Sequence, residues 1–320
     1  MLDVFITVDV EIWCNGWVDI DKKFPSAFRR YIHGQTSRGG FGLPYQLDVL
    51  KSHGLAAVHF VEPLFSTRFG SEPLQEIVGL ICAGGQEVQL HIHTEWVDEA
   101  LQPLLASSKD KRQHMFMYSR DDQTRLIAKG AALLADAGAE SINAFRAGSF
   151  GFNIDTLRAL AANGIAFDSS YNATMFGPQS GVMPNTVVVA PIDCEGVHEY
   201  PMSVFADPRG SLRHAQLTAC SFAEMEHLLW QALERGDEAF VILSHNFELL
   251  SPSMEMPDDV MVARYRKLCS FLDKNRDVFR TRGFHGLLPR PVANQPLPLK
   301  TTLWHVGARM CEQAYRRKFR

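Results

Sequence analysis

The sequence lacks a long hydrophobic run. No stretch of the roughly 18 to 20 apolar residues that a membrane-spanning helix requires occurs in its 320 residues. The chain also opens directly on a β-rich run from Leu2 to Asp9, without the basic and apolar regions of a secretory leader. We therefore expect neither a transmembrane helix nor a cleaved leader, and we expect a cytoplasmic protein.

Paired cysteines are missing as well. The six cysteines are scattered without any C-x-x-C pair: Cys14, Cys82, Cys194, Cys220, Cys269 and Cys311. This pattern argues against a zinc knuckle, a thioredoxin motif and a disulfide framework. A reducing compartment fits this cysteine usage best.

There is no excess of positive charge. The formal net charge is −4, with 32 Lys and Arg against 36 Asp and Glu, so the chain has no global attraction for nucleic acid. Nucleic acid is therefore not an expected partner.

Prolines and basic residues distinguish the C-terminal end. Four prolines disfavour regular structure there and predict a linker: Pro289, Pro291, Pro296 and Pro298. A short helix is expected from Leu303, and the chain ends on the basic run 316–320. We expect a catalytic domain over residues 1–286 and a linker with a basic tail over 287–320. The tail either contacts an anionic membrane weakly through Trp304, Phe319 and its basic residues, or stays solvated.

Short β-rich runs alternate with amphipathic helical patterns along the chain, which is typical of a parallel sheet or barrel built from βα units. The predicted strands are residues 3–9, 56–61, 87–93, 142–146, 164–168, 187–192, 197–202, 239–245 and 283–288. The predicted helices lie near residues 43–53, 73–83, 120–137, 153–163, 222–235 and 259–277. The fold class is therefore α/β.

Two carboxylates end the first predicted strand. Asp9 and Glu11 are two residues apart, so both side chains leave an extended backbone on the same face. Two adjacent carboxylates repel each other unless a positive charge lies beside them, and a metal ion would supply it. A solvated strand end is the alternative explanation.

Two histidines repeat this spacing. His91 and His93 lie at the end of the predicted strand 87–93, and Glu95 continues the alternation. Paired imidazoles on rigid backbone suit a transition-metal site that a carboxylate completes and that leaves one position open for water. A lone histidine would more often be hydrogen-bonded in a core, but a close pair beside an acidic strand favours the metal site.

Arg146 and His245 end two further strands. An arginine that reaches a carboxylate keeps it ionised, as a general base requires, although a surface arginine is the alternative. A histidine that leaves an apolar strand serves either in structural hydrogen bonding or in acid catalysis. Because the acid pair, the histidine pair, Arg146 and His245 all end different strands, they would converge on the catalytic face of a βα barrel.

In this order the motifs resemble those of NodB-type polysaccharide deacetylases, carbohydrate esterase family four, in a divergent branch with D-x-E and H-x-H motifs. The five similar segments are Thr7–Glu11, Glu87–Trp96, Phe145–Gly151, Phe167–Ser170 and Leu243–His245. The resemblance implies a distorted (β/α)7-type barrel that forms a single catalytic domain over about residues 1–286.

The resemblance also implies roles for individual residues. Asp9 would be the general base, Arg146 would orient it, and His245 would be the general acid. Glu11 and His91 would bind the metal. The family's second motif places its second histidine where this chain has Glu95, so the third ligand is either His93, which we prefer, or Glu95.

The activity implied is that of a metal-dependent carbohydrate N-deacetylase, a hydrolase of linear amide C–N bonds. The substrate would be an N-acetylated or N-formylated amino sugar of a surface polysaccharide or its precursor. We expect one divalent ion, with zinc preferred to cobalt, nickel, manganese or iron. The alternatives are an inactive carbohydrate-binding barrel and a hydrolase of a non-sugar amide.

Overall fold

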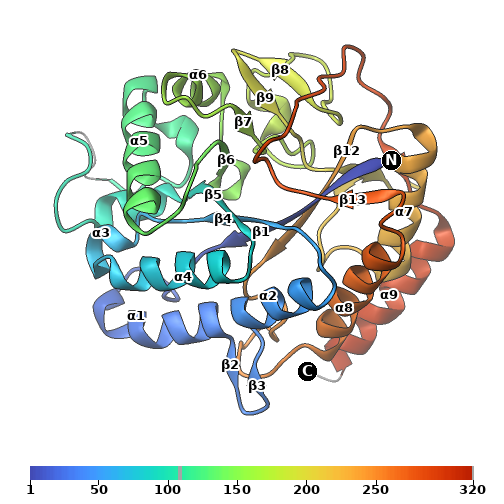
Figure 1. Cartoon of the computed structure of the whole chain (residues 1–320), viewed down its shortest axis with the longest axis horizontal. Helices are drawn as coiled ribbons and strands as arrows, with labels where there is room; N and C mark the ends of the chain where they lie inside the picture. Colours follow the sequence, from blue (N-terminus) through green and yellow to red (C-terminus); the bar gives the residue numbers. More distant parts are fainter. Residues whose placement is uncertain (107–109, 319–320) are drawn as a thin grey trace. The chain divides into compact units, whose positions relative to one another are not determined.

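The computed structural model describes residues 1–106 and 110–318, and it describes no side chain for residues 317 and 318. The chain falls into two compact units. Figure 1 labels their helices and strands. The first comprises residues 1–57, 203–282 and 297–320, and the second comprises residues 58–202 and 283–296. None of the helices in the described part of the chain is long and apolar enough to span a membrane.

The first unit is built around strand β1 (Leu2–Val10). This strand pairs in parallel with β12 (Ala239–His245) on one side and with β13 (Phe279–Thr281) on the other. The register sets Asp9 opposite His245. Because parallel strands end at the same edge of a sheet, the polar residues that end β1 and β12 come together.

Three helices contribute apolar side chains to the core of the first unit: α2 (Leu43–Ser52), α7 (Phe222–Arg235) and α8 (Asp259–Lys274). The unit also contains α1 (Ile20–Phe28) and α9 (Leu303–Lys318). A π-helical turn, Arg29–His33, follows α1. The minor strands are β2 (Gln35–Thr36), β3 (Gly39–Gly40), β10 (Val204–Ala206), β11 (Leu212–His214) and β14 (Leu299–Lys300). Ser221 and Asp258 cap α7 and α8, since their side chains accept from backbone N–H groups of the first turn.

The second unit contains a mainly parallel sheet. Its strands follow the order β4 (Val58–Val61), β5 (Glu87–Ile92), β6 (Ala144–Ala147), β7 (Phe167–Asp168), β9 (Val197–Glu199) and β8 (Ile192–Cys194). Only β8 runs antiparallel to its neighbour among the described pairs of this sheet. The helices are α3 (Ser66–Phe69), α4 (Glu72–Ala83), α5 (Arg120–Asp136) and α6 (Ile154–Ala162). The 3-10 turns are Thr94–Glu99, Met115–Met117, Gly148–Phe150 and Gly177–Gln179.

The α/β alternation predicted from the sequence is confirmed, but two predicted strands are wrong. Over 187–192 only Ile192 is in a strand, because the N–H groups of Val189 and Ala190 donate to the side chain of Gln295 at 2.7 and 2.9 Å. Over 283–288 the N–H groups of Phe284 and His285 donate to the carboxylate of Glu87 at 2.9 and 3.1 Å. In both segments a side chain replaces the neighbouring strand as hydrogen-bond acceptor.

Candidate metal centre and acid–base residues

The two carboxylates that end β1 are buried, and their backbone is held by one asparagine. The Asn246 side chain accepts from the Glu11 N–H at 3.1 Å and donates to the Glu11 carbonyl at 3.2 Å. The Asn246 N–H donates to the Asp9 carbonyl at 3.3 Å. Asn246 therefore fixes both residues from the end of β12. We did not predict this residue from the sequence, although its place directly after His245 was the available signal.

His245, at the end of β12, has a carboxylate partner that the sequence did not indicate. Its Nδ1 atom lies 2.8 Å from Oε1 of Glu248. The same carboxylate accepts from the amide of Gln216, whose Oε1 lies 2.8 Å from Nε2 of His214. Because Gln216 donates its amide to Glu248, its oxygen must accept from a protonated Nε2 of His214. The Glu248 carboxylate thus lies between the imidazole of His245 and the amide of Gln216.

This carboxylate sets the charge of His245. Burial by itself would lower the pKa of the imidazole, but the hydrogen bond to Glu248 and its charge, with the charges of Glu11 and Asp9, outweigh burial and raise the pKa to about 9. At neutral pH His245 is therefore an imidazolium. It has a proton on the nitrogen opposite Glu248, as a general acid requires.

In the second unit, β5 delivers both histidines of the predicted pair. Their ring centroids lie 4.8 Å apart at an interplanar angle of 83°. Nδ1 of His91 lies 2.8 Å from the Arg146 carbonyl, and Nδ1 of His93 lies 3.3 Å from Oε2 of Glu95. Each acceptor favours the tautomer with its proton on Nδ1, the form in which Nε2 can act as a metal ligand. Glu95 thus lies behind His93 as its hydrogen-bond acceptor.

A glycine makes room for the second imidazole. A Cβ atom on Gly148 would lie 2.7 Å from Nδ1 of His93, so a larger residue would displace the ring. The next two residues, Ser149 and Phe150, have positive φ angles of 52° and 56°, which non-glycine residues rarely adopt. This strained turn follows β6 at the position of the third motif, and strain of this kind is often found at functional sites.

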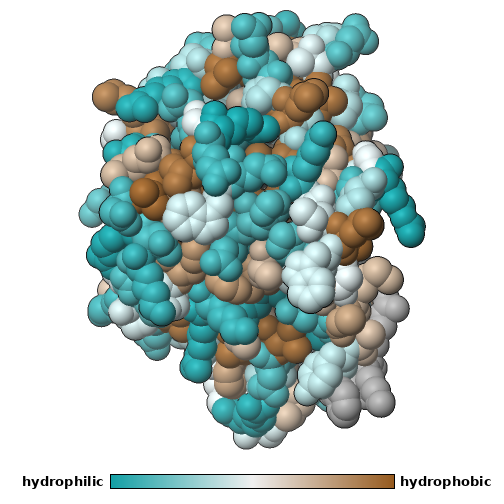
Figure 2. Space-filling model, turned by 90° about the vertical axis from the view of Figure 1, so that its right-hand side faces the viewer, coloured by the Kyte–Doolittle hydropathy of each residue, from teal (hydrophilic) through white to brown (hydrophobic). Residues whose placement is uncertain are grey.

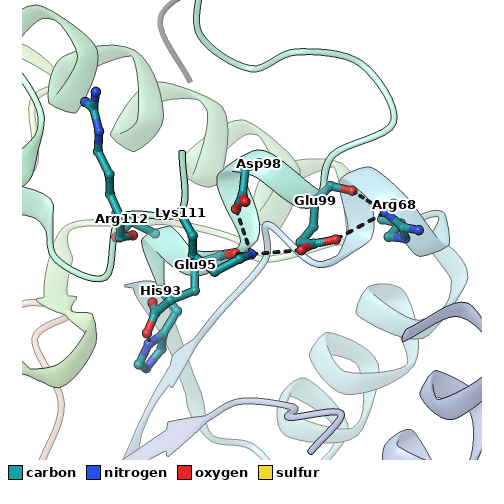
Figure 3. A network of polar contacts seen from close by, with 8 residues as sticks. Arg68, His93, Glu95, Asp98, Glu99, Lys111 and Arg112 are labelled. Atoms are coloured by element: carbon teal, nitrogen blue, oxygen red, sulfur yellow. Dashed lines mark hydrogen bonds and ion pairs between the residues drawn. The ribbon is translucent and has the colours of Figure 1, made fainter. Parts of the chain in front are cut away.

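A polar network fixes the turn that carries Glu95 (Figure 3). Nζ of Lys111 donates to the Glu95 carbonyl at 2.8 Å and to the carboxylates of Asp98 and Glu99 at 2.7 and 2.8 Å. Arg68 donates to the carbonyl and the carboxylate of Glu99 at 3.1 and 3.3 Å. One lysine therefore ties the segment after residue 109 to the turn directly after β5.

Arg146 is buried at the end of β6. Its guanidinium donates to the carbonyl and the hydroxyl of Ser169, both at 3.0 Å, and lies 4.4 Å from the ring centroid of Phe60. The predicted pairing of Arg146 with Asp9 stays a prediction. The N–H of Ala147 donates to Ser170 Oγ at 2.9 Å, so this N–H is not available to an oxyanion.

Two further carboxyl groups lie in the same unit without any exposure to solvent. Asp168 and Glu199 are opposite each other in the β7–β9 register. Burial, together with the charge of Asp168, raises the pKa of Glu199 well above its ordinary value. Burial therefore favours a protonated carboxyl group in this pair.

Three potential metal ligands among the described residues are buried at strand ends. They are Glu11 in the first unit and His91 and His93 in the second. Two imidazoles and one carboxylate match the donor set of catalytic zinc sites, which leave a position open for water. The residues present therefore fit a divalent transition metal.

The elements thus form an α/β fold whose strand ends carry buried carboxylates and histidines. The fold is shared with a Mycobacterium smegmatis protein classed as a polysaccharide deacetylase. That match has 18% sequence identity, covers 92% of this chain and 95% of that chain, and has a TM-score of 0.57. The predicted barrel class and the resemblance to polysaccharide deacetylases are therefore confirmed at the level of the fold.

Two further solved structures match over most of the chain. A family 4 carbohydrate esterase from Streptomyces lividans in complex with acetate is 13% identical, with coverages of 92% and 97% and a TM-score of 0.43. A 4-alpha-glucanotransferase from Thermococcus litoralis is 11% identical, covers 92% of this chain and 40% of that chain, and has a TM-score of 0.50. No protein-family model matches the chain, and no curated protein matches its sequence. Because a glucanotransferase shares the fold, the activity has to be argued from the site.

Proposed function

We propose that this chain is a metal-dependent hydrolase that removes an N-acetyl or N-formyl group from an amino sugar of a polysaccharide or its precursor. The observation that carries the proposal is the buried pair of His91 and His93, whose ring centroids lie 4.8 Å apart. The buried carboxylate of Glu11 is assigned as the third ligand, as the motif resemblance implies. The fold shared with the mycobacterial protein supports it. Zinc is the ion that we propose first, because two imidazoles and one carboxylate are common zinc ligands.

When bound, a divalent ion would supply a Lewis acid that polarises the acyl carbonyl and brings the pKa of a bound water to about 7. Asp9 accepts the proton of the attacking water. His245 then donates its Nε2 proton to the nitrogen of the departing amine, and Glu248 holds Nδ1 while this occurs. Arg146 is assigned to orienting Asp9, as the motif resemblance implies.

An aromatic cleft in the second unit supports a sugar substrate. The cleft measures about 240 Å³ and is lined by Phe116, Phe152, Asn153, Phe176 and Gln179. The rings of Phe116 and Phe176 lie 5.3 Å apart, at 62° to each other. Aromatic faces beside a few amide groups suit the apolar face and the hydroxyl groups of a pyranose ring.

The test combines metal analysis with turnover. Purified protein should contain zinc or a similar ion and should release acetate from N-acetylglucosamine oligomers. Asp9→Asn should keep the ion and lose turnover at least a hundredfold, because a positioned general base contributes about 10²-fold or more. The control is Asp136→Asn, the same change at the exposed end of α5, which should keep full activity.

Three results would contradict the proposal. Metal content that survives replacement of both Glu11 and His91 would exclude the assigned ligands. Glycan binding without turnover under any supplied metal would favour the inactive carbohydrate-binding barrel. Turnover of cyclic imides or formamides in place of acylated sugars would assign a non-sugar amide hydrolase.

A further inference from the structure

The C-terminal helix α9 has its polarity reversed, with its charged residues facing the protein. Arg309 donates to both carboxylate oxygens of Glu224 on α7, at 2.6 and 2.8 Å. Glu312 accepts from Arg264 on α8 at 2.6 Å. A surface helix normally turns its apolar stripe to the core and its charges to water, so this helix is inverted.

Other residues on the inward side of α9 also contact neighbouring segments. Arg316 pairs with Asp258, the N-cap of α8, at 2.6 Å. His305 stacks on His227 of α7 with ring centroids 4.6 Å apart. The charged residues of α9 are therefore paired with Glu224 on α7, Arg264 on α8 and Asp258 at the start of α8.

The outward side is apolar as a consequence. Four large side chains are exposed: Leu303 by 76%, Trp304 by 78%, Met310 by 62% and Tyr315 by 57%. The other exposed residues over 303–316 are Gly307, Cys311 and Ala314. No exposed residue over these described positions carries a charge. Figure 2 faces this side of the molecule and shows brown and pale side chains between teal ones.

The size of this face limits what can cover it. A helix of 16 residues is about 24 Å long and about 10 Å wide, so the face measures roughly 240 Å². A stable interface between two protein copies buries about 800 Å² on each partner. The face is therefore too small for a stable dimer through α9 alone, but it suits a helix that lies in a lipid surface.

The excess of positive charge at the C-terminal end favours anionic lipid as the binding partner. From Leu303 to Arg320 the sequence has five Arg or Lys (Arg309, Arg316, Arg317, Lys318 and Arg320) against one acid, Glu312. Arg309, Arg316 and Glu312 are paired within the protein. The other three basic residues follow Arg316 within four positions of the sequence. Basic residues beside an apolar helical face with Trp and Tyr are typical of attachment to anionic lipid.

We propose that the outward face of α9 docks the protein on an anionic lipid surface. The docking needs no membrane-spanning segment and is independent of the proposed hydrolase activity. Of the two aromatic residues expected from the sequence to make such a contact, Trp304 lies on this face, and Phe319 lies outside the described residues. The docked helix would lie flat, with Trp304 and Tyr315 at the level of the lipid head groups.

Flotation of the full chain with vesicles tests the proposal. Binding to vesicles of phosphatidylglycerol and phosphatidylcholine should be at least tenfold stronger than binding to phosphatidylcholine alone, and 0.5 M salt should weaken it. Trp304→Glu combined with Met310→Glu should weaken binding to the anionic vesicles at least tenfold. Arg317→Ser combined with Lys318→Ser should remove most of the preference for anionic lipid.

A matched control distinguishes binding through the outward face of α9 from binding through exposed apolar residues in general. Val18→Glu combined with Leu288→Glu makes the same chemical change at residues exposed by 75% and 81% outside α9, and it should bind vesicles like the wild type. Circular dichroism confirms folding of every variant. Flotation of the Trp304→Glu, Met310→Glu variant equal to wild type would overturn the proposal. The proposal would also be overturned if the wild-type protein did not bind vesicles but sedimented as a dimer, and if this variant sedimented as a monomer.

Discussion

Nδ1 of His245 lies 2.8 Å from a carboxylate oxygen of Glu248, three residues further along the chain. The pair fixes the orientation and the protonation of the residue assigned as general acid. It is formed within the first unit, and its carboxylate receives a second donor from Gln216.

The first prediction concerns this pair. In Glu248→Gln, the pKa of His245 should fall from about 9, because the carboxylate that stabilises the imidazolium is lost. We expect kcat to fall ten- to a hundredfold with little change in KM, and the alkaline limb of the pH profile to move to lower pH. Glu234→Gln, the same change at an exposed position of α7, is the control. An unmoved alkaline limb would show that Glu248 does not set the charge of His245.

The second prediction decides the third metal ligand. His93→Ala should lose bound metal, whereas Glu95→Gln should keep one equivalent with affinity reduced roughly 10- to 100-fold, as expected of a residue that orients a ligand. Elemental analysis and competition with a chelator measure both quantities. The reverse pattern, with metal lost in Glu95→Gln and retained in His93→Ala, would assign Glu95 as the ligand.

The third prediction concerns the sugar cleft. Phe116→Ala and Phe176→Ala should each raise KM for an N-acetylglucosamine oligomer roughly three- to tenfold, because each removes one aromatic contact worth about 0.5 to 1.5 kcal/mol. The kcat values should change little, since neither ring is assigned to the chemical step. Phe222→Ala, on α7 of the other unit, is the control. Unchanged KM values in both cleft variants would remove the cleft from the binding site.

The fourth prediction concerns the buried carboxyl pair. Burial and the charge of Asp168 raise the pKa of Glu199, so the folded chain keeps a proton that the unfolded chain releases above about pH 4.3. Wild-type stability should therefore fall as the pH rises above this value. Glu199→Gln has no such proton and should flatten this dependence. Urea unfolding between pH 5 and 8 measures it, and equal slopes for both proteins would contradict the raised pKa of Glu199.

The fifth prediction concerns His59, a fully buried histidine of β4. Burial lowers the pKa of its imidazole to about 3, whereas the unfolded chain binds the proton near pH 6.5. Below about pH 6 the folded state should thus lose up to about 1.4 kcal/mol per pH unit. His59→Leu and His59→Gln should both flatten this acid limb, although only Gln buries an amide and lowers stability overall. An acid limb as steep as in the wild type would place the acid-sensitive group elsewhere.

The sequence by itself determined where the chemically active residues lie along the strands. A strand has a side-chain period of two, so the spacing of Asp9 with Glu11 and of His91 with His93 is sufficient to place each pair on a common face. The alternation of strands and helices determined the α/β class in the same way. These features depend only on local periodicity.

The tertiary structure decided which side chains serve as partners. Glu248 binds His245 because of the conformation of the loop after β12, and Asn246 binds Glu11 because of the register between β12 and β1. No local sequence pattern encodes either feature. The carboxylate of Glu87 prevents a strand over 283–288 although the two segments are far apart in sequence. Likewise, α9 turns its apolar face outward because Glu224 and Asp258, on other helices, bind its arginines. Hydrogen bonds and ion pairs between distant segments depend on packing, and for this reason the sequence alone could not predict them.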